Sequence, residues 1–213
     1  SGERIDYEYD AAGNVTRETV LRSDTSTASE TDWFFDELGR LIRTQFGPSR
    51  AAQLSYDKVG NVTGSTSPNG HATTSAFDAL DRVVSVVAPD TGATALEYDG
   101  QDNLTSFEDP IAVETQFVYN GFGEVIQETS PDRGTNTYWY DAAGRMTQSS
   151  DGRGQVITYN RDFLGRVTSK VPTGLTGETV TYTWDTGGLS GSYEVGRLAK
   201  IVDGSGTTSF KYD

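Results

Sequence analysis

The sequence predicts an all-β chain of consecutive antiparallel β-hairpins, which together form a curved, spiralling sheet of the β-solenoid type. Three observations lead to this prediction: a phrase that recurs every 21 residues, two turn signals in each repeat, and alternation of apolar and polar residues between the turns. Alternation with a period of 2 is typical of half-buried strands, whereas a helix repeats its apolar residues at 3.6. The twist of the strands and a bulge at each turn are expected to bend the sheet.

The repeated phrase consists of an aromatic residue, Asp, two variable residues, Gly, a polar residue and an aliphatic residue. It is complete at Phe35-Asp36-Glu37-Leu38-Gly39-Arg40-Leu41. The glycine position then recurs without slipping by a residue, at Gly39, Gly60, Asp81, Asp102, Gly123, Gly144 and Gly165. A fixed interval of this kind is the signature of a repeat architecture, in which each unit is stabilised by its neighbours.

Asp-x-x-Gly predicts a type I turn that closes a hairpin with a bulge. The Asp side chain accepts a hydrogen bond from the backbone N–H two residues later, and the Gly adopts the left-handed conformation. Asp tolerates that conformation better than most residues, so Asp81 and Asp102 fit the glycine position, and we expect a positive φ there in every phrase. The predicted turn residues are Asp10, Gly13, Asp36, Gly39, Asp57, Gly60, Asp78, Asp81, Asp99, Asp102, Asn120, Gly123, Asp141, Gly144, Asp162 and Gly165.

A second series of turn signals lies midway between these phrases. Its members are Pro68–Gly70, Pro89–Gly92, Asp109-Pro110, Pro131–Gly134 and Asp151–Gly154. Two turns in each repeat leave two strands of about 20 Å. We therefore expect a second set of turns at the opposite end of each hairpin.

Residues 1–213 are expected to form a single repeat array. The regular repeats are expected over 31–170, with irregular or inserted loops at 22–30, 172–178 and 187–195. The last two residues, Tyr212-Asp213, open another phrase. We therefore expect the chain to be a fragment of a larger protein.

The aromatic residues of the phrases form a column along the predicted sheet. Such a column is expected to pack across neighbouring strands, and a stripe of rings for stacking on sugars is the less favoured alternative. The column consists of Tyr9, Phe35, Tyr56, Phe77, Tyr98, Tyr119, Tyr140 and Trp184.

Composition excludes several classes of function. The chain has no Cys and a single His, His71, which leaves no residues for a thiolate or multi-histidine metal site. The net charge of −14 argues against a nucleic-acid partner and against an anionic membrane surface. No apolar run reaches the length of a membrane span, so membrane insertion is not expected.

The acidic residues are interpreted as turn formers, so that no catalytic, cofactor-binding or metal-binding residue is predicted. A catalytic pair of carboxylates occurs once in a chain, whereas the Asp of the phrase recurs in almost every repeat. The segment Asp99–Asn103 lacks the alternating acids and distal Glu of a calcium loop. The glycosylation-type sequences at Asn14, Asn61 and Asn103 are interpreted as by-products of the repeat. We expect neither an enzyme nor a cofactor.

The phrases resemble the YD repeat, also called the Rhs repeat, of bacterial polymorphic toxins, of the B and C components of insecticidal toxin complexes, and of animal teneurins. The resemblance covers nearly the whole chain. It implies a long sheet that spirals into a hollow shell, which encloses a C-terminal toxin in the bacterial members. The Arg or Asn after the glycine position, as at Arg40 and Asn61, resembles the bacterial members more closely. The family's Asp-Pro-x-Gly cleavage sequence is absent, because Asp109-Pro110 is followed by Ile111-Ala112.

Taken together, these observations predict a structural scaffold, part of the wall of a toxin-encapsulating shell in a secreted or surface-displayed bacterial protein. Its expected partners are the neighbouring repeats of the parent protein and the enclosed toxin. Because a fragment of a sheet has uncovered edges, self-association edge to edge is a further expectation. The alternative is an extracellular module that binds carbohydrate or a cell surface.

Overall fold

The computed structural model describes residues 3–90, 92–175, 177–186, 193 and 195–213. These residues form nineteen β-strands, which belong to one sheet, and no helix. The described part of the chain therefore contains no helix long and apolar enough to cross a membrane. The predicted all-β class of consecutive antiparallel hairpins is confirmed.

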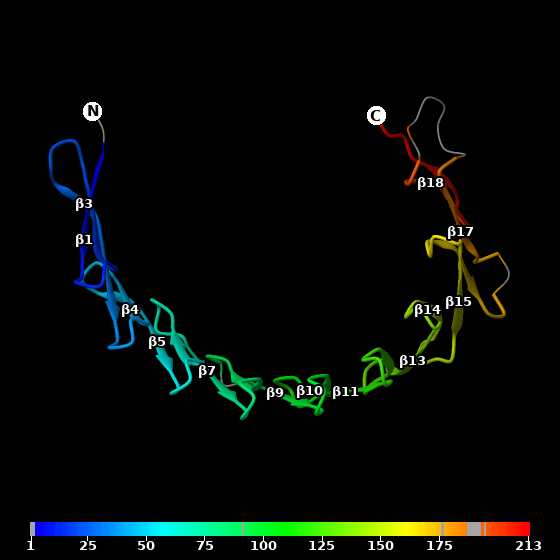
Figure 1. Ribbon diagram of the computed structural model, residues 1–213, viewed down its shortest axis with the longest axis horizontal. Coiled ribbons are helices and arrows are strands. Elements are labelled where there is room, and N and C mark those ends of the chain that lie inside the picture. The colour runs from blue at the N-terminus through cyan, green and yellow to red at the C-terminus, as the bar shows by residue number, and fades with distance from the viewer. Residues whose placement is uncertain (1–2, 91, 176, 187–192, 194) are drawn as a thin grey trace. The chain divides into compact units, whose positions relative to one another are not determined.

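The strands are four to nine residues long and follow one another in chain order (Figure 1). They are β1 (Arg4–Tyr9), β2 (Val15–Leu21), β3 (Thr27–Phe35), β4 (Leu41–Phe46), β5 (Arg50–Tyr56), β6 (Val62–Thr66), β7 (Ala72–Phe77), β8 (Val83–Val87), β9 (Ala93–Tyr98), β10 (Leu104–Glu108), β11 (Glu114–Tyr119), β12 (Val125–Ser130), β13 (Gly134–Tyr140), β14 (Met146–Ser150), β15 (Val156–Arg161), β16 (Val167–Pro172), β17 (Val180–Trp184), β18 (Leu198–Asp203) and β19 (Gly206–Ser209).

The chain divides into two units. The first consists of Ser1–Glu97 with Glu108–Ala112, and in it each strand from β1 to β9 pairs antiparallel with the next. The second consists of Tyr98–Phe107 with Val113–Asp213, and the same holds from β11 to β19. Each unit is thus a series of hairpins.

Two kinds of turn alternate along the chain. The phrase turns contain the Asp-x-x-Gly sequences and join β1 to β2, β3 to β4 and so on, while the opposite turns join β2 to β3, β4 to β5 and so on. In the hairpins from β1–β2 to β7–β8 and from β11–β12 to β17–β18, the register shifts by one residue at the aromatic position: for example, Phe34 pairs with Arg43, but Phe35 pairs with Leu41. The β-bulge that the sequence predicts is therefore present.

Neither unit has a globular core. Ala199 is the only buried hydrophobic residue among those described, and no large side chain in that part of the chain is fully buried. Most strand residues are half-buried, as in β2 and β16. The hairpins are therefore held by their hydrogen-bonded neighbours and by side chains that join one hairpin to the next, as in other repeat proteins.

The irregular regions differ in part from the prediction. The loop expected over 22–30 ends sooner, because β3 begins at Thr27, and Glu30 pairs with Thr19 of β2. The predicted end of this loop was wrong because every residue of β3 is half-buried or exposed, and such a strand accepts polar residues that resemble a loop in sequence. The loop expected at 172–178 begins one residue later, since Pro172 still pairs with Ile157. In the loop expected at 187–195, residues 187–192 and 194 lie outside the described residues.

Candidate functional site: the turn ladder

The Asp of a phrase turn organises the turn with its side chain. Asp36 Oδ1 accepts the backbone N–H groups of Leu38 and Arg40, both at 2.9 Å, and Oδ2 accepts Arg40 Nε at 2.7 Å. The backbone closes through Asp36 N to Arg40 O and Gly39 N to Asp36 O, at 2.9 and 3.0 Å. The hydrogen bond from the Arg40 backbone, with the other donors, holds the pKa of Asp36 below its usual value.

The same arrangement recurs in the other phrase turns. The φ angle is +75° at Gly39, +62° at Asp81 and +67° at Asp102, so the two Asp residues adopt the glycine conformation. The remaining predicted positions, Gly13, Gly60, Gly123, Gly144 and Gly165, also have positive φ. The prediction of left-handed backbone at the glycine position is confirmed.

In one phrase turn the carboxylate stands at the second position of the pair instead of the first. Asn120 stands at the Asp position and Glu124 at the position of Arg40. Asn120 Oδ1 accepts the backbone N–H groups of Phe122 and Glu124, at 2.9 and 3.1 Å, and Asn120 Nδ2 donates to Glu124 Oε2 at 2.6 Å. The two backbone hydrogen bonds are kept, and the hydrogen bond between the two side chains is reversed, since Asn120 donates where Asp36 accepts. The two positions therefore act as a complementary pair.

The residue after the glycine position also reaches the next phrase turn. Arg40 Nη1 donates to Asp57 O at 3.0 Å, and Asn61 Nδ2 donates to Asp81 Oδ1 at 2.8 Å. In the second unit, Arg145 lies so close to Gly165 that a Cβ there would meet its guanidinium at 3.0 Å. We call the phrase turns, with these side-chain ties between them, the turn ladder.

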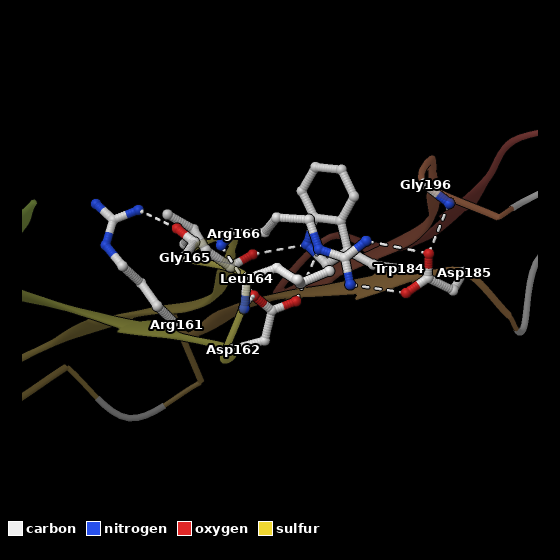
Figure 2. A network of polar contacts seen from close by, with 9 residues as sticks. Arg161, Asp162, Leu164, Gly165, Arg166, Trp184, Asp185 and Gly196 are labelled. Carbon is white, nitrogen blue, oxygen red and sulfur yellow. Dashed lines mark hydrogen bonds and ion pairs between the residues drawn. The ribbon is translucent and has the colours of Figure 1, made fainter.

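The turn ladder is most complete at Arg166. Figure 2 shows this guanidinium between two carboxylates: Nε donates to Asp162 Oδ2 at 2.7 Å, while Nη1 and Nη2 donate to Asp185 Oδ1 and Oδ2 at 3.0 and 2.7 Å. Its plane lies over the ring of Trp184, 5.1 Å from the ring centre. Arg166, and then the backbone N–H of Gly196, lower the pKa of Asp185 to about 2, and the two carboxylates raise the pKa of Arg166. Bidentate geometry of this kind fixes the spacing of two turns as well as their charge.

A second tie runs from the aromatic position of one phrase to the aliphatic position of the phrase before it. Tyr56 Oη donates to Leu41 O at 2.7 Å, and Tyr140 Oη donates to Val125 O at 2.8 Å. The same contact is made by Tyr119 to Leu104 O at 2.8 Å, Trp184 Nε1 to Val167 O at 2.9 Å and Tyr212 to Leu198 O at 2.9 Å.

Arg161 stands at the aromatic position of a degenerate phrase and replaces this contact. Its Nη2 donates to Met146 O at 3.0 Å, and its Nη1 donates to Gly165 O at 3.0 Å. The guanidinium of Arg161 thus donates the hydrogen bond that a Tyr hydroxyl donates in other phrases. These ties were not predicted from the sequence, although the preference for Tyr over Phe at the aromatic position was a signal for them.

The aromatic column is partly exposed. Phe35, Phe77 and Trp184 are half-buried, whereas Tyr9 in the first strand is 61% exposed. The column also contributes hydrogen bonds, since its hydroxyl and indole groups donate to the preceding hairpin.

The segments around Trp184-Asp185 and Gly196-Arg197-Leu198 are the two halves of one phrase. Asp185 N donates to Arg197 O at 3.0 Å, and Gly196 N donates to Asp185 Oδ1 at 2.7 Å. Trp184 pairs with Leu198 after the usual register shift. The turn is therefore closed as in the other phrases, with additional residues between its halves. Loops were predicted here from the sequence, but the joining of the two halves was not.

Catalytic and metal-binding chemistry finds no support in the ladder. Hydrogen bonds lower the pKa of Asp141 and Asp162, whereas a general acid at neutral pH requires a raised pKa. No group of three or more His, Asp or Glu residues in the described part of the chain is arranged to hold a metal ion. His71 is exposed and lines a shallow hollow of about 500 Å³ with Leu54 and Pro89.

The glycosylation-type sequences have a structural explanation. Asn14 Nδ2 and Asn103 Nδ2 donate to the Asp of their own turns at 2.9 Å, and Asn61 Nδ2 donates to both Asp57 and Asp81. These amide groups are therefore part of the turn ladder.

The chain is similar to known proteins in its sequence pattern and in its fold. The family model described as the teneurin YD-shell matches residues 3–189. No curated protein matches the chain. Among solved structures, the chain is similar to TcdB2–TccC3 without its hypervariable C-terminal region, with 15% identity and a TM-score of 0.60 over 84% of this chain and 12% of that chain.

Two further solved structures are similar. The first is TcdB2–TccC3–Cdc42, with 15% identity and a TM-score of 0.61 over 97% of this chain and 13% of that chain. The second is the Photorhabdus luminescens Tc holotoxin pore, with 15% identity and a TM-score of 0.64 over 97% of this chain and 12% of that chain. At these identities the likeness concerns the fold. This chain spans about an eighth of their length. Since the family model covers most of the sequence and the ladder explains its repeated phrase, the chain belongs to the teneurin YD-shell family.

Proposed function

We propose that this chain is one section of the wall of a hollow β-shell, which encapsulates a C-terminal toxin in a secreted or cell-surface bacterial protein. The observation that carries the proposal is the turn ladder, which joins successive hairpins by side-chain ties where neither unit has a globular core. The proposal includes a single repeat array over residues 1–213 within a longer protein.

A wall requires strength between neighbours and no pocket for a substrate. Ties such as Arg166 to Asp185 and Tyr140 to Val125 O act between successive hairpins. A sheet built in this way extends by adding further hairpins at either edge, because each unit interacts only with its neighbours. The likeness in fold to Tc toxin structures supports a shell. In this proposal the partners are neighbouring repeats and the enclosed polypeptide, and the chain performs no catalysis.

The test uses the longer protein that carries this segment. Limited proteolysis of the wild type is expected to spare the segment C-terminal to the shell. The double substitution Arg166→Ala and Asp185→Ala opens the wall and is expected to make that segment accessible to protease. Arg153→Ala is the matched control, because among the described residues the Arg153 side chain pairs only with Asp151 of its own turn, and it is 88% exposed. Rapid cleavage of the segment in the wild type would contradict encapsulation.

Carbohydrate or cell-surface binding is the second candidate. It is favoured by aromatic side chains at the tips of phrase turns, where Phe122 is 92% and Phe163 is 93% exposed. Exposed aromatic rings are suited to stacking on sugars or on a partner surface. A glycan array tests this function: binding by the wild type that is lost with Phe122→Ser and Phe163→Ser supports it, and absence of binding rejects it.

A further inference from the structure

We infer that Asn69 is the residue at which the folded chain undergoes spontaneous deamidation, and that the turn ladder protects the same sequence at Asn120. Asn-Gly occurs at Asn69-Gly70, in an opposite turn, and at Asn120-Gly121, in a phrase turn. The two dipeptides have the same intrinsic chemistry, so a difference in their rates arises from the structure around them.

Deamidation at Asn-Gly is an intramolecular substitution. The backbone nitrogen of the Gly attacks Cγ of the Asn side chain, a C–N bond forms, and the bond from Cγ to the amide nitrogen breaks. That nitrogen leaves as ammonia with the proton from the attacking nitrogen, which gives a five-membered succinimide. Water then opens the ring at either carbonyl and produces Asp or isoaspartate. Gly favours the reaction because it has no Cβ to obstruct the approach, and the side-chain carbonyl must be free to reach the attack geometry.

Asn69 has this freedom. It is exposed, as is Gly70, and its side chain makes no hydrogen bond within the part of the chain that the structure describes. The turn that contains it is closed by two backbone hydrogen bonds, Ser67 N to His71 O at 2.8 Å and Gly70 N to Ser67 O at 2.9 Å. Of these, only the second involves the attacking nitrogen. Breaking the single neutral hydrogen bond from Gly70 N to Ser67 O therefore frees the attacking nitrogen.

Asn120 is held at both side-chain atoms. Its Oδ1 accepts the backbone N–H groups of Phe122 and Glu124, and its Nδ2 donates to the Glu124 carboxylate at 2.6 Å. Movement of Cγ toward Gly121 N breaks these bonds together. One of them is to a charged group, and such bonds are stronger than neutral ones. The side chain that organises the turn is thus also kept from reacting.

The two products have different consequences. At Asn69, isoaspartate lengthens the backbone of the opposite turn between β6 and β7 and adds a negative charge beside His71. At Asn120, conversion to Asp places a second carboxylate against Glu124, where the amide now donates at 2.6 Å. Like charges at that distance oppose folding of the turn. Protection of Asn120 therefore preserves a tie of the ladder, whereas Asn69 lies outside the ladder.

The experiment follows both residues in one sample. The folded chain is incubated in mildly alkaline buffer, and peptides are separated and identified by mass spectrometry at intervals, which distinguishes Asn, Asp and isoaspartate. We expect Asn69 to react at least about tenfold faster than Asn120, since several hydrogen bonds protect only the latter. A parallel sample in concentrated urea is expected to show similar rates at the two residues.

Two variants sharpen the test. Asn69→Ser is expected to remove the main product, and Glu124→Ala is expected to raise the rate at Asn120 while the rate at Asn69 stays unchanged. Equal rates at the two residues in the folded chain would overturn the inference. A preference for Asn69 that persisted in urea would do so as well, because the cause would then be the local sequence.

Discussion

The phrase turns and the opposite turns reverse the same strands by different chemistry. In a phrase turn, a carboxylate such as that of Asp36 binds the backbone of its own turn, and Arg40 extends to the next. Two neighbouring opposite turns instead come together through backbone atoms. A Cβ at Gly152 would lie 2.0 Å from Arg133 O and 2.9 Å from Gly134 Cα. Side chains thus set the spacing at one end of the hairpins, and small residues permit close approach at the other.

This difference gives glycine two separate roles. Gly39 is required for its φ of +75°, and no atom of the described residues beyond its chain neighbours lies within 4 Å of the place where its Cβ would be. Gly152 has no positive φ, but it has no room for a side chain. The first role is visible in the sequence because it recurs with the phrase. The second depends on which turn lies beside it.

The largest effect is expected for Gly152→Ala. The added methyl group overlaps the backbone of the neighbouring turn, which cannot rotate away as a side chain does, so we expect a loss of about 3 kcal/mol of unfolding free energy. Urea unfolding measures the change. Gly121→Ala is the control, since its Cβ meets nothing within 4 Å and its φ is not positive. Equal stability of the two variants would show that the opposite turns are not closely packed.

The second-largest loss of unfolding free energy is expected for Gly39→Ala. A Cβ in left-handed backbone costs about 1–2 kcal/mol, and no clash adds to this. Gly100→Ala is the matched control. Gly100 lies in the phrase turn between β9 and β10, where an added Cβ would meet no described atom within 4 Å and φ is not positive. A Gly39→Ala variant as stable as the wild type in thermal unfolding would contradict the turn assignment.

Tyr140→Phe tests the tie between successive phrases. Removal of the hydroxyl leaves Val125 O without its donor, so we expect a loss of about 1 kcal/mol. The reverse substitution, Phe77→Tyr, is expected to add the equivalent contact and to stabilise the chain by a similar amount or less. Tyr193→Phe, at a residue that is 75% exposed, is the control and should leave the urea midpoint unchanged.

The smallest loss of stability per turn is expected when the pH is lowered. Hydrogen bonds lower the pKa values of Asp36, Asp141 and Asp162, and that of Asp185 falls to about 2. These carboxylates bind protons more weakly when folded, so their stabilisation is complete above the ordinary Asp value of 3.8 and is lost as the pH falls through the lowered values.

Unfolding measured in urea over this acid range provides the test. Asp185→Asn is expected to show a shallower loss of stability with falling pH than the wild type, by a modest amount because the carboxylate is partly exposed to solvent. If the wild type and Asp185→Asn lost stability identically as the pH falls, Asp185 would not stabilise the turn ladder. Asp132, in an opposite turn, supplies a matched Asp132→Asn control.

Much of the fold was predictable because its signals are local. The positive φ at Asp81 and the bulge before Phe35 both follow from residues within a single phrase. The end of the loop after Leu21 was not predictable, since the polar residues of β3 resemble a loop until β2 is placed beside them. Joining Asp185 to Arg197 also needed the structure, because the intervening residues separate the halves of the phrase.

The contacts of the turn ladder also divide into those that the sequence predicts and those that it does not. The pairing of Asp with the Arg or Asn four residues later is contained in the phrase, and so is the exchange to Asn120 with Glu124. The contact of Tyr140 with Val125 O, and the bidentate contact of Arg166 with Asp185, join different phrases. No spacing within a phrase specifies them.

By itself, the sequence determined where the chain turns, which residues take left-handed backbone and which residues alternate along the strands. These are properties of neighbours in the chain, decided over a few residues by steric limits and local hydrogen bonds. Only the tertiary structure decided which side chain reaches the next turn and which glycine has no room for a methyl group. Those contacts depend on the separation and twist of adjacent hairpins, which arise only when the strands pair.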